Sequence, residues 1–282
     1  MNMYRLTAHG KTLLLDKPVV MGILNVTPDS FSDGGDFAAF EAACRHADEM
    51  VAQGAGIIDI GGESTRPGAA EVSLSEELAR VIPLVKYVVA NHDVWISVDT
   101  SKAEVMRQAV AAGAHLINDV RALQEPGALQ AAAELNVPVC LMHMQGQPDS
   151  MQAAPLYNNV LDEVEAFLHA RVEACIAAGI SREHLLLDVG FGFGKTLEHN
   201  YQLLANLDRF HQMALPLLIG LSRKSMIGNL LGRAPKDCLA GSLAGAMQAL
   251  QLGAHIIRVH DVAQTCNMVE VFQACKQQRR ND

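Results

Sequence analysis

Polar side chains recur where short apolar runs of this sequence end. Ten residues share that position: Asn25, Asp59, Asp99, Asn118, His143, Asp188, Ser222, Lys224, Arg258 and His260. A polar group that is buried near a strand end costs free energy unless it is paired. Any one of the ten is readily explained as a satisfied polar group of the core, but ten at the same relative position indicate one shared site.

The chemistry of these residues divides them into two sets. Asp99, Asn118 and Asp188 can accept hydrogen bonds from a donor-rich edge, such as that of an aminopyrimidinone ring. Arg258, His260 and Asn25 form an anion-binding corner suited to phosphate oxygens. Lys224 lies between the two sets. The pattern therefore predicts that the ligand is a flat heterocycle with an anionic tail.

Alternating strands and helices must position these residues. Eight continuous apolar runs are typical of strands covered on both faces, at 19–25, 56–62, 94–100, 115–120, 138–144, 185–190, 215–222 and 255–260. Helical patterns lie between them, at 38–54, 74–91, 102–112, 127–135, 159–178, 199–210, 237–252 and 261–278. Eight such repeats favour an α/β fold, a closed (β/α)8 TIM barrel, formed by residues 1–282 as a single domain. An initial hairpin around Gly10 is expected to cap the barrel floor.

A six-residue pattern occurs three times, at 54–59, 113–118 and 253–258. Each copy begins with glycine, which ends a helix in the left-handed conformation before the next strand starts. The repeat mainly reflects this type of connection. Its last position is informative, because it places Asp59, Asn118 and Arg258 at equivalent points along three strands.

Two connections are long for loops between a strand and a helix, which usually have two to six residues. They span residues 25–37 and 61–73, and they carry Phe31 and Arg66 just beyond strand ends. Long polar loops with an aromatic and a guanidinium group are candidates for loops that close over a second substrate.

The stretch DVGFGFGKT at 188–196 resembles a nucleotide-binding loop but fails the spacing test. A phosphate-binding loop needs four residues between its first glycine and Gly-Lys, and Gly190 leaves only three. Asp188, which precedes the glycines, is the functional candidate. Phe193 is expected near the second substrate, and Lys195 is expected to be a solvated loop charge.

The composition excludes several classes of protein. The net charge is −9, which argues against a nucleic-acid or membrane-surface binder. The six cysteines show no CxxC pair or zinc-ligand spacing, so we expect core thiols in a reducing compartment. We expect no signal peptide, because the start of the chain lacks a long apolar segment, and no apolar run reaches the roughly 18 residues of a membrane span. A cytoplasmic protein is expected.

Several long motifs resemble those of one family. MGILNVTPDSFSDGG (21–35) with IGGESTRPGA (60–69) looks like the signature pair of the dihydropteroate synthases, and ISVDTSK, LINDV, PVCLMHMQG, GLSRKS and IIRVHDV follow in the expected order. The resemblance covers about residues 19 to 262. It implies a pterin-binding barrel of the folate pathway, which condenses dihydropterin pyrophosphate with 4-aminobenzoate to give 7,8-dihydropteroate and pyrophosphate, with Mg²⁺ as the cofactor.

The resemblance also implies roles for individual residues. The pterin would contact Asp99, Asn118, Asp188 and Lys224, and the pyrophosphate would contact Asn25, Arg258 and His260, with Asn25 also on Mg²⁺. The 4-aminobenzoate site would be shaped by Phe31, Thr65, Arg66, Pro67, Phe193 and Ser222, and Met142 and Gly220 complete the substrate-binding set. The residues expected to be catalytic are Asp99, Asp188, Lys224, Arg258 and His260. Lys224→Ala would mainly weaken pterin binding and Arg258→Ala pyrophosphate binding.

One departure from the family pattern occurs in the glycine-rich stretch. Val189 stands where the family usually has proline, which restores a backbone N–H and could loosen the loop around Asp188. The other motifs are intact, so we expect sensitivity to sulfonamides. Relatives of this family lead us to expect a homodimer through the C-terminal helices.

Three alternatives remain open from the sequence. A pterin-binding module that presents methyltetrahydrofolate to a corrinoid protein would share the Asp and Asn contacts, but it would not need the STRPG loop or the pyrophosphate corner. A Schiff-base aldolase using Lys224 would need a depressed lysine pKa, which Arg223 and the anion corner disfavour. The third alternative is a catalytically silent paralogue.

Overall fold

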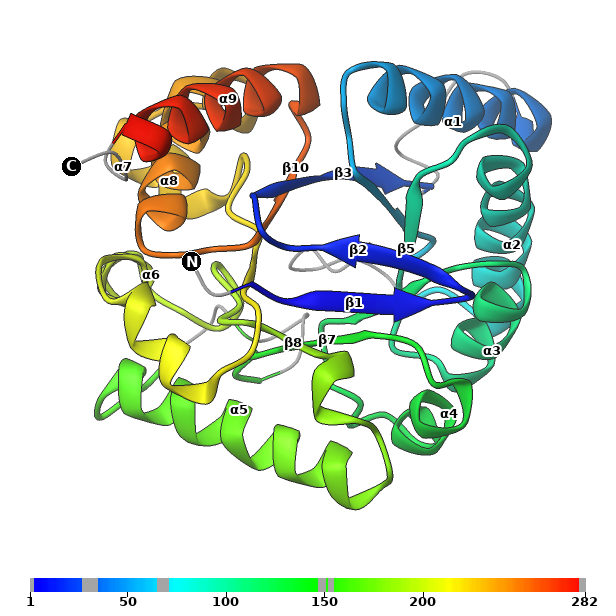
Figure 1. The fold of residues 1–282 in the computed structure, drawn as a ribbon, viewed down its shortest axis with the longest axis horizontal. Coiled ribbons are helices and arrows are strands. Elements are labelled where there is room, and N and C mark those ends of the chain that lie inside the picture. Colours follow the sequence, from blue (N-terminus) through cyan, green and yellow to red (C-terminus); the bar gives the residue numbers. More distant parts are fainter. Residues whose placement is uncertain (1–2, 27–34, 65–70, 147–150, 152–154, 279–282) are drawn as a thin grey trace.

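The computed structural model describes residues 3–26, 35–64, 71–146, 151 and 155–278. Its main feature is a parallel sheet of eight strands in the order β8-β7-β6-β5-β4-β3-β10-β9. The two outer strands of this order meet, because Leu187 bridges Leu217 and the Leu187 N–H donates to the Pro216 carbonyl at 3.0 Å. The sheet is thus a closed barrel with helices around it (Figure 1), which confirms the expected (β/α)8 fold.

The observed elements follow the expected alternation closely. The barrel strands are β3 (Val19–Asn25), β4 (Ile57–Gly61), β5 (Trp95–Asp99), β6 (Leu116–Asp119), β7 (Val139–Met142), β8 (Leu185–Asp188), β9 (Leu218–Ile219) and β10 (Ile256–Val259). The helices are α1 (Gly35–Ala52), α2 (Leu74–Asn91), α3 (Ala103–Ala111), α4 (Ala128–Leu135), α5 (Val160–Ala177), α6 (Leu197–Ala205), α7 (Ser225–Leu231), α8 (Leu239–Gln251) and α9 (Val262–Gln278).

Two elements differ from the expectation. Strand β9 has only two residues, and Pro216, which lacks an amide hydrogen, limits pairing at its start. Helix α7 was not expected. It has seven residues, of which Met226 and Ile227 are buried, and so short a segment shows too few apolar positions for a helical period to be read.

The N-terminal hairpin covers one end of the barrel. Strands β1 (Arg5–Ala8) and β2 (Lys11–Leu14) pair antiparallel and lie across the barrel mouth in Figure 1. The rings of Tyr4 and His255 pack edge to face at 5.0 Å, and the imidazole of His9 packs in the same way on that of His115 at 5.8 Å. Both barrel histidines immediately precede strands β10 and β6, so the hairpin closes the amino-terminal end of the barrel, as expected.

The three-fold glycine pattern has the expected conformation. Gly54, Gly113 and Gly253 have φ angles of 98°, 110° and 92°, and each follows a helix and precedes a barrel strand. L-residues rarely adopt positive φ, which explains why glycine opens each copy of the repeat.

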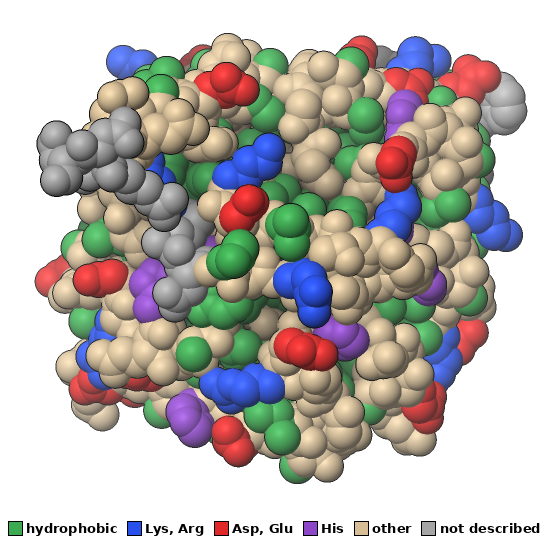
Figure 2. Space-filling view, in the orientation of Figure 1, with side chains coloured by type: hydrophobic (Ala, Val, Ile, Leu, Met, Phe, Trp, Pro, Cys, Tyr) green, Lys and Arg blue, Asp and Glu red, His purple; other side chains and the backbone are tan. Residues whose placement is uncertain are grey.

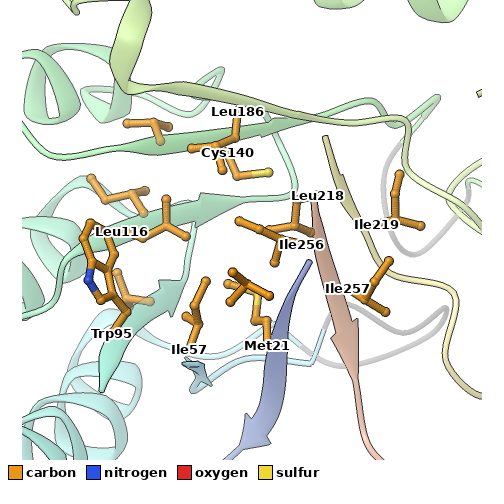
Figure 3. Packing of buried hydrophobic residues seen from close by; sticks show 14 of the residues in the cluster. Met21, Ile57, Trp95, Leu116, Cys140, Leu186, Leu218, Ile219, Ile256 and Ile257 are labelled. Carbon is orange, nitrogen blue, oxygen red and sulfur yellow. The ribbon is translucent and has the colours of Figure 1, made fainter. Parts of the chain in front are cut away.

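An apolar plug fills the half of the barrel near the amino-terminal ends of its strands. Figure 3 shows one plug residue from each of the eight strands pointing into the barrel: Met21, Ile57, Trp95, Leu116, Cys140, Leu186, Leu218 and Ile256. Ile219 and Ile257, the next residues on β9 and β10, point to the outer face of the sheet. Because side chains two residues apart share a face of a strand, the residues after this plug also point inward. Asn118, Asp188 and Arg258 each lie two positions beyond a plug residue, at the carboxyl end of the barrel.

The surface and the cysteines agree with the composition. Figure 2 shows the face that carries the hairpin, where acidic and basic side chains are interspersed. All six cysteines are free thiols, and four of them are buried. Within the described residues, none of the helices combines the length and apolar character needed to cross a membrane.

Candidate active site

Three of the expected residues and Gly61 form a row across the carboxyl end of the barrel. The register of β3 to β6 places Asn25 beside Gly61, Gly61 beside Asp99, and Asp99 beside Asn118. A Cβ atom at Gly61 would lie 3.5 Å from Asn25 Oδ1 and 3.4 Å from Asp99 Cβ. Glycine therefore keeps the space between the Asn25 amide and the Asp99 carboxylate free of a side chain.

Arg258 crosses the barrel interior to two carboxylates. Its Nε donates to Asp59 Oδ2 at 2.6 Å and one terminal nitrogen donates to Asp99 Oδ2 at 2.7 Å. Asn118 Nδ2 donates to the same Asp59 oxygen at 3.2 Å. The last positions of the three-fold repeat thus meet in one buried network. The sequence grouped Arg258 apart from Asp99, but the structure brings them into direct contact.

The charges in this network modify one another. Burial raises the pKa of Asp99 to about 7, against the opposing effect of Arg258. Burial also opposes the charge of Arg258, but Asp59 and Asp99 outweigh it and raise the guanidinium pKa. Asp99 therefore changes its charge in the neutral range while Arg258 stays positive, which is typical of functional sites.

Lys224 and Asp188 form the opposite side of the site. Lys224 Nζ donates to the carbonyl oxygen of Phe191 at 2.6 Å and lies 4.7 Å from the centroid of the Phe193 ring. Burial lowers its pKa to about 8, although Asp188 opposes this. The expectation that its neighbours would keep the lysine pKa undepressed is wrong, because desolvation exceeds the attraction of Asp188.

Asp188 is fixed at the start of the glycine-rich loop. Its Oδ1 accepts a hydrogen bond from the Gly190 N–H at 2.7 Å. Burial raises the pKa of Asp188, and Lys224 and this hydrogen bond lower it. The amide that holds the carboxylate belongs to Gly190, two residues on, and the Val189 side chain is fully buried. The unusual valine therefore does not remove the contact that orients Asp188.

Lys195 is buried, so the expectation of a solvated loop charge is wrong. Its Nζ contacts the carbonyl oxygens of Gly190 and Phe193 at 2.8 and 3.0 Å, and His143 Nδ1 at 2.9 Å. The side chain is 3 % exposed. Spacing along the sequence could not reveal that this lysine folds back beneath its own loop.

We predict that Gly190→Ala lowers the free energy of unfolding by more than about 4 kcal/mol. Gly190 has φ +69°, and an added Cβ would lie 1.8 Å from the carbonyl oxygen of His143. Gly232→Ala is the matched control, since Gly232 has φ +62° but nothing within 4 Å of the added atom. The control should cost about 1 kcal/mol, from backbone strain alone. The free energy of unfolding of both variants is measured by urea unfolding. Equal losses in Gly190→Ala and Gly232→Ala would contradict the prediction, because they would show that the contact with the His143 carbonyl has no energetic cost.

The loops after β9 and β10 are joined by side-chain contacts. Ser222 Oγ lies 3.2 Å from His260 Nδ1, and Arg223 Nε donates to Asp261 Oδ2 at 3.0 Å. Arg223 has φ +57°, a strained conformation for a residue with a side chain. Arg223 and Asp261 were not among the expected site residues, although each adjoins one, Lys224 and His260.

Met142 and Gly220 also lie at this end of the barrel. Met142 pairs with Asp188 in the register of β7 and β8. A Cβ atom at Gly220 would lie 3.7 Å from Arg258 Cβ and 3.8 Å from Lys224 Nζ. Four expected residues, Phe31, Thr65, Arg66 and Pro67, lie outside the described residues.

The donor set at Asn25 fits magnesium only as a partly hydrated ion. Mg²⁺ prefers oxygen ligands and usually keeps several waters while it binds substrate phosphates. Asn25 offers one amide oxygen beside the open space at Gly61. Within the ranges that the structure describes, no group of three or more His, Cys, Asp or Glu side chains could hold a metal. An ion at Asn25 would have this amide oxygen as one of its ligands.

Comparisons with known proteins agree with this arrangement. Residues 21–260 match the family model described as pterin binding enzyme. The chain is similar to a dihydropteroate synthase of Escherichia coli strain K12, with 58% identity over 277 residues and 98% of each chain covered.

Solved structures agree with the sequence comparison. A Yersinia pestis dihydropteroate synthase in a sulfonamide drug complex has a TM-score of 0.93 and 57% identity, covering 97% of this chain and 99% of that one. A Xanthomonas albilineans dihydropteroate synthase with 4-aminobenzoic acid has a TM-score of 0.93 and 52% identity, covering 98% and 99%. The chain therefore belongs to the pterin binding enzyme family and, within it, to the dihydropteroate synthases.

Proposed function

We propose that the chain condenses 6-hydroxymethyl-7,8-dihydropterin pyrophosphate with 4-aminobenzoate, giving 7,8-dihydropteroate and pyrophosphate. The observation that carries this proposal is the buried cluster of Asp99, Asp188, Lys224 and Arg258 in a chain 58% identical to a dihydropteroate synthase over nearly its full length. The structure of a relative with 4-aminobenzoic acid supports the second substrate.

The pterin ring is bound by the two carboxylates and the amide. Asp188 and Asp99 accept hydrogen bonds from the N–H groups of the aminopyrimidinone edge, and Asn118 supplies a donor and an acceptor between them. Arg258 and Lys224 offset part of the effect of burial, which raises the pKa of both carboxylates. The cluster is thus organised before the substrate arrives.

The reaction breaks the bond between the pterin methylene carbon and the pyrophosphate oxygen. Arg258 and His260 stabilise the charge on the departing oxygen, and the carboxylates of Asp99 and Asp188 stabilise the positive charge that spreads over the pterin. When bound, Mg²⁺ neutralises part of the pyrophosphate charge. The bond electrons leave with pyrophosphate, which is released as an anion.

The amine of 4-aminobenzoate then forms the new carbon–nitrogen bond and loses one proton to solvent or pyrophosphate. Phe193 and Ser222 lie on the side of the site where Lys224 and His260 are placed. Phe193 offers an aromatic face to the arylamine ring. Because the arylamine nitrogen is the nucleophile, this condensation needs no covalent bond between Lys224 and the substrate, and the Schiff-base alternative is set aside despite the lowered pKa of Lys224.

Calorimetry distinguishes this function from a methyltetrahydrofolate module. The condensing enzyme should bind 4-aminobenzoate measurably only when a pterin analogue and pyrophosphate are both present, because together they complete the second site. A module that presents a methyl group should show no such dependence on pyrophosphate. Binding of 4-aminobenzoate that is unchanged by pyrophosphate would contradict the proposal.

We predict a bell-shaped pH profile of kcat/KM. Activity should rise as Asp99 ionises around its pKa of about 7 and fall as Lys224 loses its proton around about 8. Lys224→Arg should keep the acidic limb and lose the alkaline one, because a guanidinium does not titrate in this range. If the alkaline limb persists in Lys224→Arg, the loss of activity at high pH is caused by the titration of another group.

We also propose that Mg²⁺ supports the reaction through Asn25. A chelator should abolish turnover by the wild-type chain, and Asn25→Ala should raise the Mg²⁺ concentration for half-maximal activity by about 10-fold or more. The measurement is a magnesium titration at saturating substrates. Full activity in excess chelator would remove magnesium from the mechanism.

The assembly and location are proposals of the same kind. We propose a homodimer through the C-terminal helices, which is supported by the exposure of Val271 on α9 (60%). A monomer in sedimentation at micromolar concentration would contradict it.

The free thiols support a cytoplasmic location, which cell fractionation would test.

The relative in complex with a sulfonamide drug supports inhibition by sulfonamides, and an uninhibited enzyme would contradict this.

A further inference from the structure

Side chains hold the backbone of the glycine-rich loop at nearly every residue. Gly190 N–H donates to Asp188, the Phe191 carbonyl accepts from Lys224, and Gly192 N–H donates to Asn200 Oδ1 at 2.7 Å. The Gly194 carbonyl accepts from the Tyr157 hydroxyl at 2.8 Å. The carbonyl oxygens of Gly190 and Phe193 both accept hydrogen bonds from Lys195 Nζ.

The loop is also packed directly on the chain that follows β7. A Cβ at Gly194 would lie 2.2 Å from the carbonyl oxygen of Gln145, and one at Gly190 would overlap that of His143. Lys195 Nζ bonds across this contact to His143 Nδ1 and lies 3.4 Å from the His143 carbonyl. One amine therefore ties both ends of the loop to the end of a neighbouring strand.

The described partners of the Lys195 amine are neutral, which is unusual for a buried lysine. Burying an ammonium group is costly unless the group is paired, and burial here lowers the pKa of Lys195 well below its ordinary value. Burial also lowers the pKa of His143, with Lys195 as the second cause, so the imidazole stays neutral and can accept a hydrogen bond. A methionine or leucine would fill the same space without the cost, but it would take this donor from the Phe193 carbonyl and leave the Gly190 carbonyl with the Phe193 N–H, at 3.2 Å, as its donor.

We propose that Lys195, with His143, is a positioning residue for the second substrate, because it fixes the loop that carries Phe193 beside Lys224. The inference rests on the proposed condensation and extends it to a side chain outside the substrate-binding set. The Phe193 ring lies 4.7 Å from Lys224 Nζ, and its own carbonyl is held by Lys195 at 3.0 Å. Asp188 has its own contact at Gly190 N–H, so the pterin side of the site depends less on Lys195.

The test is the Lys195→Met variant, measured against Lys236→Met. Lys236 is exposed and distant in sequence from the loop, so its replacement controls for loss of a lysine. Lys195→Met should raise the KM for 4-aminobenzoate by about 10-fold or more, since small displacements of a positioning group have large effects. Binding of the pterin pyrophosphate alone, measured by calorimetry, should change by less than about 3-fold. A KM equal to that of the control, or equal losses for both substrates, would overturn the proposal.

Chemical rescue separates positioning from general damage. Propylamine should restore part of the aminobenzoate KM of Lys195→Ala, because it replaces the missing atoms and donates hydrogen bonds. Tetramethylammonium carries charge without N–H donors and should not restore it. Rescue by both compounds, or by neither, would contradict a role through hydrogen bonds to the loop carbonyls.

A second pair of variants decides the matter if Lys195→Met and Lys195→Ala do not fold. His143→Asn keeps an acceptor for the amine, and His143→Leu removes it. The leucine variant alone should raise the KM for 4-aminobenzoate, and it should also speed amide hydrogen exchange within residues 190–195 without substrates. Equal behaviour of the two variants would overturn the proposal. Failure of the wild-type chain to form dihydropteroate would instead refute the proposed function, and the exchange measurement would still test the contact.

Discussion

Replacing Asp188 with asparagine is expected to lower kcat/KM by about 10²–10³-fold while the protein stays folded. The substitution keeps the size of the side chain and an oxygen that can accept the Gly190 N–H. It removes the negative charge that faces Lys224 and the pterin cation. Because that cation develops only as pyrophosphate leaves, the loss should be larger in kcat than in pterin binding.

Steady-state kinetics and pterin calorimetry on the same preparation measure this split. Asp237→Asn is the control, since Asp237 is an exposed aspartate in the short helix at 235–237. A loss confined to pterin affinity, with kcat unchanged, would show that Asp188 only holds the ring. It would then have no part in stabilising charge in the transition state.

Replacing Arg258 with methionine is expected to lower the free energy of unfolding by about 3–5 kcal/mol and to abolish activity. The guanidinium is the shared partner of Asp59, which is fully buried, and of Asp99. Without it, two carboxylates face each other in the barrel interior. The sequence predicted that loss of Arg258 would mainly weaken pyrophosphate binding. We now expect pterin and pyrophosphate binding to fall together, because Arg258 contacts the pterin-side carboxylate of Asp99.

The pH dependence of this loss has a definite sign. Removing the guanidinium should raise the pKa of Asp99 above its present value of about 7. A carboxyl group with a raised pKa in the folded state costs stability as the pH rises above its unfolded pKa. The deficit of Arg258→Met should therefore be larger at about pH 8 than at about pH 5.

Arg209→Met is a matched control for this variant. Arg209 also contacts two carboxylates, Asp162 at 2.6 Å and Glu165 at 2.5 Å, but this group is one-third exposed. Surface ion pairs contribute little to stability, so the control should unfold almost as the wild type does. Comparable losses in the two variants, or a deficit that is independent of pH, would mean that the buried pairs are not what stabilises the barrel interior.

The fold could be predicted from the sequence because each level of the pattern pointed the same way. Continuous apolar runs, helical patterns in strict alternation with them and glycines at the connections together specify a parallel barrel. The alternation of side chains along each strand also indicated where the site lies. A polar residue two positions after a plug residue points into the barrel as well, nearer the carboxyl end of the strand. Asp59, Asn118 and Arg258 were placed at equivalent points by the repeat alone.

Contacts across the barrel could not be predicted in this way. Grouping Arg258 with His260 followed their chemistry and their shared strand end, but β10 lies beside β3, and the long arginine side chain reaches the carboxylates of β4 and β5. Lys195 was misplaced for a similar reason. Three glycines allow the loop carbonyls to turn inward, and only the folded chain shows that a lysine amine meets them.

The central claim is that this chain joins the pterin to the arylamine, and one measurement tests it most directly. Purified protein is incubated with dihydropterin pyrophosphate and Mg²⁺, with and without 4-aminobenzoate, and both pyrophosphate and dihydropteroate are quantified. The assignment predicts one pyrophosphate released for each dihydropteroate formed when both substrates are present. It also predicts that Asp188→Asn forms this product about 10²–10³-fold more slowly. Absence of dihydropteroate from the wild-type chain would contradict it and would indicate a catalytically silent paralogue.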